Sequence, residues 1–170
     1  MKKFELTSEF VTFLGKTLFR IKALVSFGDV AEGELGGFIE RENNLDQSGN
    51  AWVYGNAQVF GNAWVFGNAQ VFGDAQVFGN AWVYGDAQVY GNAWVQNCRD
   101  YSATSCFGSE NRTTTFFRTK DGGISVRCGC FYGTLREFRE KVKERHGDSR
   151  LAKEYLMLAD LMEFRLSKDE

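Results

Sequence analysis

The sequence predicts a mainly β protein built around a short parallel β-helix. The first observation is an internal repeat, because residues 50–97 are eight consecutive hexads with the consensus (N/D)-A-(W/Q)-V-(F/Y)-G. The second is the period, since six residues fit no α-helical repeat and one hexad cannot bury its own face without stacking on others. The third is composition: Phe occurs 16 times and Trp 4 times, which argues against disorder.

Each hexad is expected to supply one short strand and one turn. Its Ala and Val are two residues apart, so in a strand they point to the same side. The Gly that precedes Asn or Asp accepts the positive φ that a tight turn requires. We therefore expect Ala and Val inside the coil and the larger alternating side chains outside.

The repeat resembles that of the left-handed hexapeptide-repeat β-helices, in which three hexads close one triangular coil of 18 residues. This resemblance implies that residues 18 apart stack on one face. Trp64 then falls on Trp82, and Trp52 heads a stack that continues with Gln70 and Gln88. Gln58 and Gln76 lead to Trp94. The expected aromatic columns are Tyr54 with Phe72 and Tyr90, Phe60 with Phe78, and Phe66 with Tyr84.

The outer surface of these coils is unusually apolar. The hexads contain no Lys, Arg, Glu or His, and Asp74 and Asp86 are their only charged residues. Apolar patches of this kind usually mark a contact. The residues expected to form a binding wall are Trp52, Trp64, Trp82, Trp94, Phe66 and Tyr84. The alternative is that terminal segments of the same chain fold over one wall.

Residues 1–49 are predicted to form a β segment that leads into the β-helix. Apolar runs at 11–14 and 17–24 flank Gly15 and indicate a hairpin. Ile39 and Leu45 are six residues apart, so the first coil can start before the perfect repeats. The Glu-rich stretch 40–46 is then expected at a coil edge, where charge protects exposed strand edges.

Residues 98–170 are predicted to form a β-hairpin followed by two helices. The hairpin pairs 113–118 with 124–128 across the turn at 120–123. Thr134 and Glu137 form a capping box that starts a helix ending at His146, with Gly147 as the stop. A second helix runs to about Leu166. The helical hairpin can close the open end of the β-helix.

The four cysteines are Cys98, Cys106, Cys128 and Cys130, and no secretion signal is visible, so we expect reduced thiols in a cytoplasm. Cys128 and Cys130 are two residues apart and are expected to share one face of a strand as small buried side chains. The alternative is a zinc site. It would need all four thiols to converge, and neither spacing is a usual ligand pair.

The sequence disfavours an enzyme. Hexapeptide-repeat acyltransferases use a histidine of the β-helix as general base, whereas the one histidine here, His146, falls in the last turn of a predicted helix. No phosphate-binding loop, nucleophile elbow or metalloprotease motif is present. The net charge of −2 gives no case for general nucleic-acid or membrane binding. We expect no transmembrane helix, no metal and no cofactor.

The resemblance extends beyond the repeat. The stretches 27–30, 33–40 and 50–53 look like the leading segment of small hexapeptide-repeat proteins of bacteria, prophages and phages. The stretches 107–109, 112–117 and 128–135 are similar to the end of the same group. Most of these proteins have no assigned activity. The resemblance implies oligomerisation and a phage or prophage origin.

The leading hypothesis is a non-enzymatic, homo-oligomeric binding protein of the host cytoplasm. It would inhibit a host defence factor or sequester a small nucleotide-like signalling ligand. Arg112, Arg118 and Arg127 would supply phosphate contacts if their strands pair, the alternative being a solvated strand face. An acyltransferase relative and a purely structural assembly protein remain open. The sequence leaves the partner, the ligand and the oligomeric order undetermined.

Overall fold

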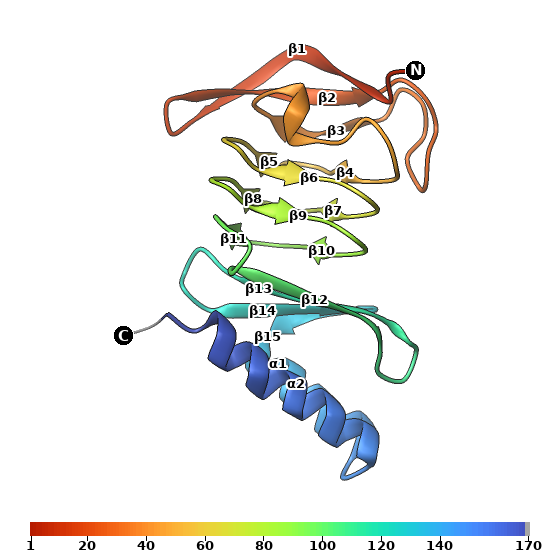
Figure 1. The fold of residues 1–170 in the computed structure, drawn as a ribbon, viewed down its shortest axis with the longest axis vertical. Coiled ribbons are helices and arrows are strands. Elements are labelled where there is room, and N and C mark those ends of the chain that lie inside the picture. Colours follow the sequence, from red (N-terminus) through yellow and green to blue (C-terminus); the bar gives the residue numbers. More distant parts are fainter. Residues whose placement is uncertain (169–170) are drawn as a thin grey trace.

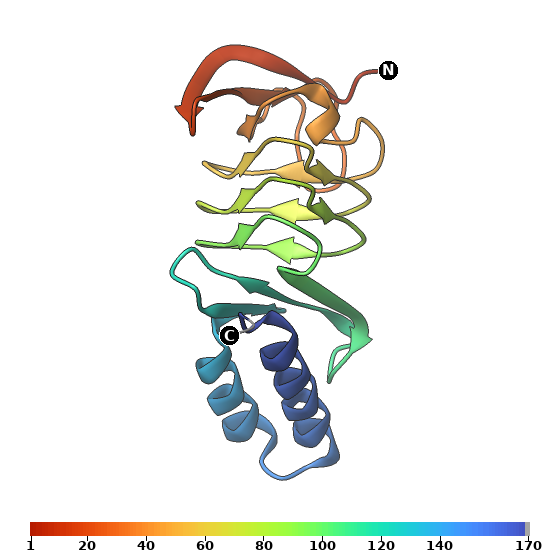
Figure 2. The same cartoon turned by 60° about the vertical axis from the view of Figure 1, so that its left-hand side comes forward.

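A computed structural model describes residues 1–168, which stack in layers along one long axis (Figures 1 and 2). An N-terminal hairpin lies at one end, three short-stranded coils follow, and an antiparallel sheet with two helices lies at the other end. The elements are β1 Phe4–Phe13, β2 Lys16–Ala23, β3 Leu35–Ile39, η1 Glu42–Asn44, β4 Trp52–Val53, β5 Gln58–Val59, β6 Trp64–Val65, β7 Gln70–Val71, β8 Gln76–Val77, β9 Trp82–Val83, β10 Gln88–Val89, β11 Trp94–Val95, β12 Tyr101–Phe107, β13 Arg112–Arg118, β14 Ile124–Cys128, β15 Phe131–Thr134, α1 Leu135–His146 and α2 Arg150–Leu166.

The repeat folds as a β-solenoid with the predicted 18-residue register. Each hexad strand pairs in parallel with the strand three hexads on, so that Trp64 lies on Trp82 and Trp52 lies on Gln70. The strands form three columns, β3–β5–β8–β11, β4–β7–β10 and β6–β9. Backbone amides of each coil donate to carbonyls of the next, which satisfies groups that a lone hexad would leave unpaired.

The solenoid core is a ladder of Ala and Val, as predicted. Every Ala and Val of the hexads is fully or almost fully buried. The glycines that end the first seven hexads have φ between 59° and 70°, where a Cβ is strained. At Gly61 a Cβ would also lie only 3.2 Å from the Gly79 amide nitrogen. The small core residues and the glycine turns together let successive coils stack at strand spacing.

The predicted aromatic columns form outside this core. Ring centroids are 4.4 Å apart for Tyr54 and Phe72, and 5.2 Å apart for Phe66 and Tyr84. Glutamine side chains form a ladder beside them, in which Gln76 Nε2 donates to Gln58 Oε1 at 3.0 Å. Each coil therefore binds the next through side chains as well as backbone.

The first coil starts before the perfect repeats, as Ile39 and Leu45 predicted. Ile39 pairs with Val59 and Leu45 with Val65, so both occupy valine positions of the ladder. Leu45 and Val53 are eight residues apart instead of six, and at this corner the amides of both Asn50 and Ala51 donate to the Gly67 carbonyl oxygen. The N-terminal β1–β2 hairpin extends the β3 column as an antiparallel edge.

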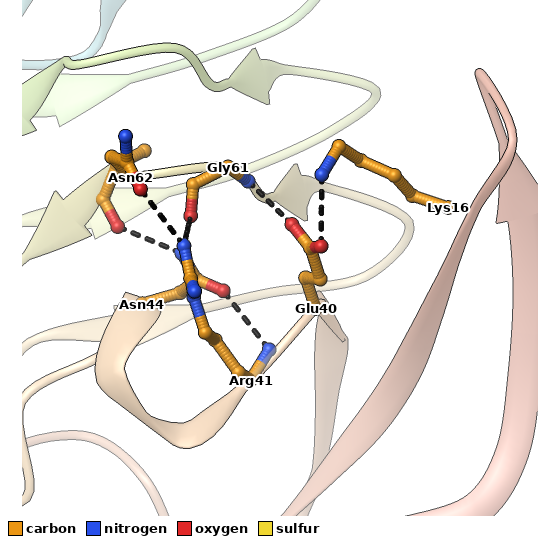
Figure 3. Close-up of polar contacts among 7 residues, drawn as sticks. Lys16, Glu40, Arg41, Asn44, Gly61 and Asn62 are labelled. Atoms are coloured by element: carbon orange, nitrogen blue, oxygen red, sulfur yellow. Dashed lines mark hydrogen bonds and ion pairs between the residues drawn. The ribbon is translucent and has the colours of Figure 1, made fainter.

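The 40–46 stretch fastens this first coil to the second (Figure 3). Glu40 accepts hydrogen bonds from Lys16 Nζ at 2.8 Å and from the Gly61 amide at 2.6 Å. Buried Asn44 donates to the carbonyl oxygens of Gly61 and Ala63. Burial raises the pKa of the Glu40 carboxyl, but these hydrogen bonds and nearby positive charges bring it below its usual value. This charged cluster has a structural role.

The C-terminal sheet, β12–β13–β14–β15, closes the solenoid. Phe117 joins the solenoid core, whereas its neighbour Phe116 joins a second core that contains both helices. Adjacent strand residues point to opposite faces, so β13 covers the coils on one side and the helices on the other. The expectation that the helices themselves close the solenoid is wrong: they pack on the face of the sheet that points away from the coils (Figure 2).

The two helices begin and end close to the predicted residues. Thr134 Oγ1 accepts from the Glu137 amide while the Glu137 carboxylate accepts from the Thr134 amide, which is the predicted capping box. Ser149 caps α2 by accepting from the Ala152 amide. Arg139 of α1 binds Asp160 and Glu163 of α2 at 2.6 and 2.7 Å, and these bonds raise the pKa of the Arg139 guanidinium.

The prediction for the cysteine pair is wrong. Cys128 ends β14 half-buried and accepts a hydrogen bond from Thr114 Oγ1, while Cys130 is exposed in the turn before β15. Gly129, with φ of 58°, reverses the chain between them, so they do not share a strand face. Cys98 and Cys106 are exposed as well.

Candidate functional site

The wall carrying β4, β7 and β10 is covered at its first coil by the N-terminal segment. Phe27 and Phe4 pack against Trp52 with centroid distances of 5.3 and 6.2 Å, and Trp52 is fully buried. Lys3 lies over the Phe27 ring at 4.8 Å. Trp52 is therefore a core residue, and its assignment to an exposed wall is wrong.

The wall carrying β5, β8 and β11 is also largely covered. Phe13 of β1 packs against Phe60 at 5.6 Å, and Phe60 is buried. Trp94 packs edge-on against Phe78 at 4.8 Å, and Lys120 Nζ lies 5.7 Å from its ring centroid. The alternative that the chain's own termini fold over the coils holds for these two walls.

The third wall, on β6 and β9, exposes Trp82 and Tyr84 and leaves Trp64 and Phe66 half-buried. We call Trp64, Phe66, Trp82 and Tyr84 the open wall. Trp64 stacks on Phe66 at 4.0 Å and meets Trp82 edge-on at 6.0 Å. Trp82 is 51% exposed and Tyr84 is 52% exposed. Four of the six residues predicted to form a binding wall thus come together, on strands that lie at the front in Figure 1.

A buried tyrosine fixes the backbone of β9, which carries Trp82 of the open wall. The Tyr101 hydroxyl donates to the Trp82 carbonyl oxygen at 2.6 Å, and burial raises the pKa of Tyr101. Cys98 Sγ accepts a hydrogen bond from the Trp82 amide at 3.4 Å. The aromatic rings therefore project from a fixed backbone, which lowers the entropy lost when a partner binds.

A second apolar surface lies on α2. Met157, Leu161 and Phe164 are spaced by four and three residues and share one helix face, and Phe164 is 85% exposed. We call these three residues the α2 stripe. No such stripe was predicted from the sequence, although the spacing of its three residues was visible there.

The three arginines proposed as phosphate contacts do not form one cluster. Arg118 donates to Asp100 Oδ1 and to the carbonyl oxygens of Leu166 and Ser167, so its three nitrogens are used within the chain. Arg127 lies over the Tyr90 ring at 5.1 Å and donates to Gln88. Arg112, at the start of β13, borders a groove together with Arg127.

Arg112 also lines a larger cleft between the C-terminal sheet and α1, with a volume of about 580 Å³. Its apolar surface comes from aromatic rings of both elements, and α1 adds basic groups to its edge. Its lining includes Phe107, Arg112, Phe131, Lys141, Arg145 and Tyr155. The sequence analysis did not find this cleft. The spacing of Lys141 and Arg145 on one helix face was the available signal.

The one histidine and the acidic side chains of residues 1–168 do not gather into a metal-binding group. Within that part of the chain, no group of three or more His, Cys, Asp or Glu side chains is placed to hold a metal ion. His146 stacks on Tyr155 at 5.6 Å, at the end of α1 and away from the coils. An acyltransferase base is expected in the coils, where this sequence has no histidine.

Comparison with known proteins bears on the fold. Residues 57–73 match the family model described as "YdcK Beta solenoid repeat". The match covers just under one 18-residue coil, and together with the three stacked columns it confirms the resemblance to small repeat β-helix proteins. No curated protein matches the chain. Among the helices of residues 1–168, none is long and apolar enough to cross a bilayer.

Proposed function

We propose that this chain is a non-enzymatic binding protein and that the open wall is its contact surface for a partner protein. The observation that carries the proposal is the half-exposure of Trp82 and Tyr84 on the one wall that the described termini leave uncovered. Trp and Tyr are among the residues that contribute most to protein interfaces. Their hexads carry no Lys, Arg or Glu that would have to be desolvated on contact.

The narrower role is the inhibition of a host defence factor by a phage or prophage protein in the host cytoplasm. It is supported by the resemblance of the leading segment and tail to small hexapeptide-repeat proteins of bacteria, prophages and phages. The free state of all four cysteines is compatible with a reducing compartment. Self-association through the same wall is the competing use of this surface.

Two double variants test the proposal. Trp64→Ser with Trp82→Ser removes the open wall, and Leu161→Ser with Phe164→Ser removes the α2 stripe as a matched control. Each protein would be expressed with an affinity tag in its native host cell. Proteins retained by each would be quantified by mass spectrometry, and circular dichroism would check the fold.

We expect at least one protein that the wild type and the stripe variant retain equally and that the wall variant loses at least tenfold. That protein would then be purified and titrated against all three. Sedimentation tests whether the partner is a second copy of this chain. In that case the wild type and the stripe variant would have the mass of an oligomer, and the wall variant would have a lower mass. Binding that depends on the stripe alone, or on neither surface, would contradict the proposal.

A further inference from the structure

We propose that the cleft between the C-terminal sheet and α1 binds a flat aromatic molecule that carries a phosphate or carboxylate group. The ligand would be about the size of a nucleoside monophosphate. This site is separate from the open wall, and it uses residues that the proposed partner contact leaves free. The cleft's size, its aromatic lining and its basic edge support this assignment.

Phe107 and Phe131 are half-buried and offer ring surface to a planar ligand, and the nearly buried rings of Phe138 and Tyr155 support them from below. Phe107 meets Tyr155 edge-on at 5.5 Å, and Phe138 lies 5.7 Å from Phe131 and 5.9 Å from Tyr155. Aromatic clusters of this geometry accept a further ring by stacking or edge contact. The cleft volume of about 580 Å³ falls within the range of roughly 300–1,000 Å³ that is typical of small-molecule sites.

The edge of the cleft is basic. Arg112 contributes from the sheet, and Lys141, Arg145 and His146 contribute from α1. Glu110 is the one acidic residue among those that line the cleft. Lys141 is paired with Glu144 at 3.0 Å, whereas Arg112 and Arg145 are exposed and have no carboxylate partner within residues 1–168. An anionic group at this edge would therefore meet guanidinium groups from two elements, which suits the paired N–H donors of arginine.

The cleft is already formed in the free chain. The Tyr155 hydroxyl accepts from the Ser109 amide at 3.0 Å, which ties α2 to the loop after β12. Arg112 lies over the turn before β15, because its Nη1 would be 3.7 Å from a Cβ on Gly129. Phe138 is buried between the helices and the sheet. A ligand therefore need not order these elements when it binds.

Calorimetric titration with three probes tests the proposal. 1-Naphthyl phosphate supplies a ring and an anion, 1-naphthol supplies the ring alone, and inorganic phosphate supplies the anion alone. We expect 1-naphthyl phosphate to bind at least tenfold more tightly than either of the others. Adenosine monophosphate, titrated next, asks whether a nucleotide fits as well.

Arg112→Gln with Arg145→Gln should weaken 1-naphthyl phosphate at least tenfold and leave the weak naphthol binding unchanged. Arg136→Gln is the matched control, because Arg136 is an exposed arginine of α1 that does not line this cleft. Equal affinity for all three probes, equal affinity of both variants, or no binding of 1-naphthyl phosphate would overturn the proposal. None of these variants alters the open wall, so its test is unaffected.

A second readout locates the probe. Cys130 lines the cleft, whereas Cys98 is exposed beside the open wall. Saturating 1-naphthyl phosphate should slow iodoacetamide labelling of Cys130 several-fold and leave Cys98 unchanged, as measured by peptide mass spectrometry. If the probe leaves the labelling rate of Cys130 unchanged, as it leaves that of Cys98, this cleft is excluded as the site.

Discussion

Trp52 and Trp82 occupy the same position of the same repeat and have opposite environments. Trp52 is fully buried under Phe4 and Phe27, and Trp82 is 51% exposed. Both begin a two-residue strand, and both have a buried valine beside them. The difference comes from the segments outside the repeat, because the N-terminal chain covers Trp52 and Phe60 on two walls of the solenoid and leaves the wall of Trp82 uncovered.

This contrast separates what the repeat determines from what the flanks determine. The hexads set the register, the Ala and Val ladder and the outward direction of the large side chains. The flanks decide which of those side chains become core. The position of a residue within the hexad thus fixes the direction of its side chain. Whether that side chain is buried depends on contacts made by residues far away in the sequence.

The largest effect is expected from a change in the Ala and Val ladder that underlies both walls. Val65→Asp would put a carboxylate without a partner among fully buried Val and Ala side chains, at a cost of about 5 kcal/mol or more, which is comparable with the total stability of a domain. We expect loss of the cooperative unfolding transition in urea. Asn80→Asp is the control, because exposed Asn80 accepts from Asn62 Nδ2 and an aspartate occurs at the same position in other hexads. A native-like Val65→Asp protein would show that the valines do not face the core.

The next effect measures the contrast itself. Trp52→Ser removes a buried ring and should lower the free energy of unfolding by about 3–5 kcal/mol. Trp82→Ser removes an exposed ring and should lower it by less than about 1 kcal/mol. Urea titrations followed by circular dichroism give both values. Similar losses in the two variants would show that the open wall is part of an intrachain core.

A smaller, pH-dependent effect tests the cover over Trp52. Lys3 Nζ donates to the carbonyl oxygens of Ala51, Ser48 and Gly49, and burial lowers the pKa of Lys3 from 10.5 to about 8. Between these two pH values the unfolded chain holds this proton more tightly than the folded chain does. The contribution of Lys3 to stability therefore rises as pH increases from about 8 to 10.5.

Lys3→Met should remove this pH-dependent contribution. The difference between the urea midpoints of unfolding of the wild type and the variant should therefore shift in favour of the wild type as pH rises from about 8 to 10.5. Lys2→Met is the control, since Lys2 forms an exposed ion pair with Glu42. If the two variants have parallel pH profiles, Lys3 keeps its proton equally well in the folded and the unfolded chain.

Much of this fold is predictable from the sequence because the repeat is local and periodic. The valine-like role of Ile39 and the capping box at Thr134 follow from spacing, whereas the stacking of Trp64 on Trp82 follows from the 18-residue coil that the family resemblance implies. The turn at Gly129 was not predicted, because the spacing of Cys128 and Cys130 is also typical of one continuous strand. The cleft was missed because Phe107, Arg112 and Arg145 come from separate elements that only tertiary packing brings together.

The most direct measurement of the central claim is photo-crosslinking from the open wall inside the native host cell. Tyr84 would be replaced by p-benzoylphenylalanine, with Tyr54 on the covered wall and Phe164 on the α2 stripe as comparison positions. The proposal predicts a defined adduct with another protein from position 84 and little from position 54. Adducts that form from position 164 alone, or equally from all three positions, would contradict the assignment of the open wall as the contact surface.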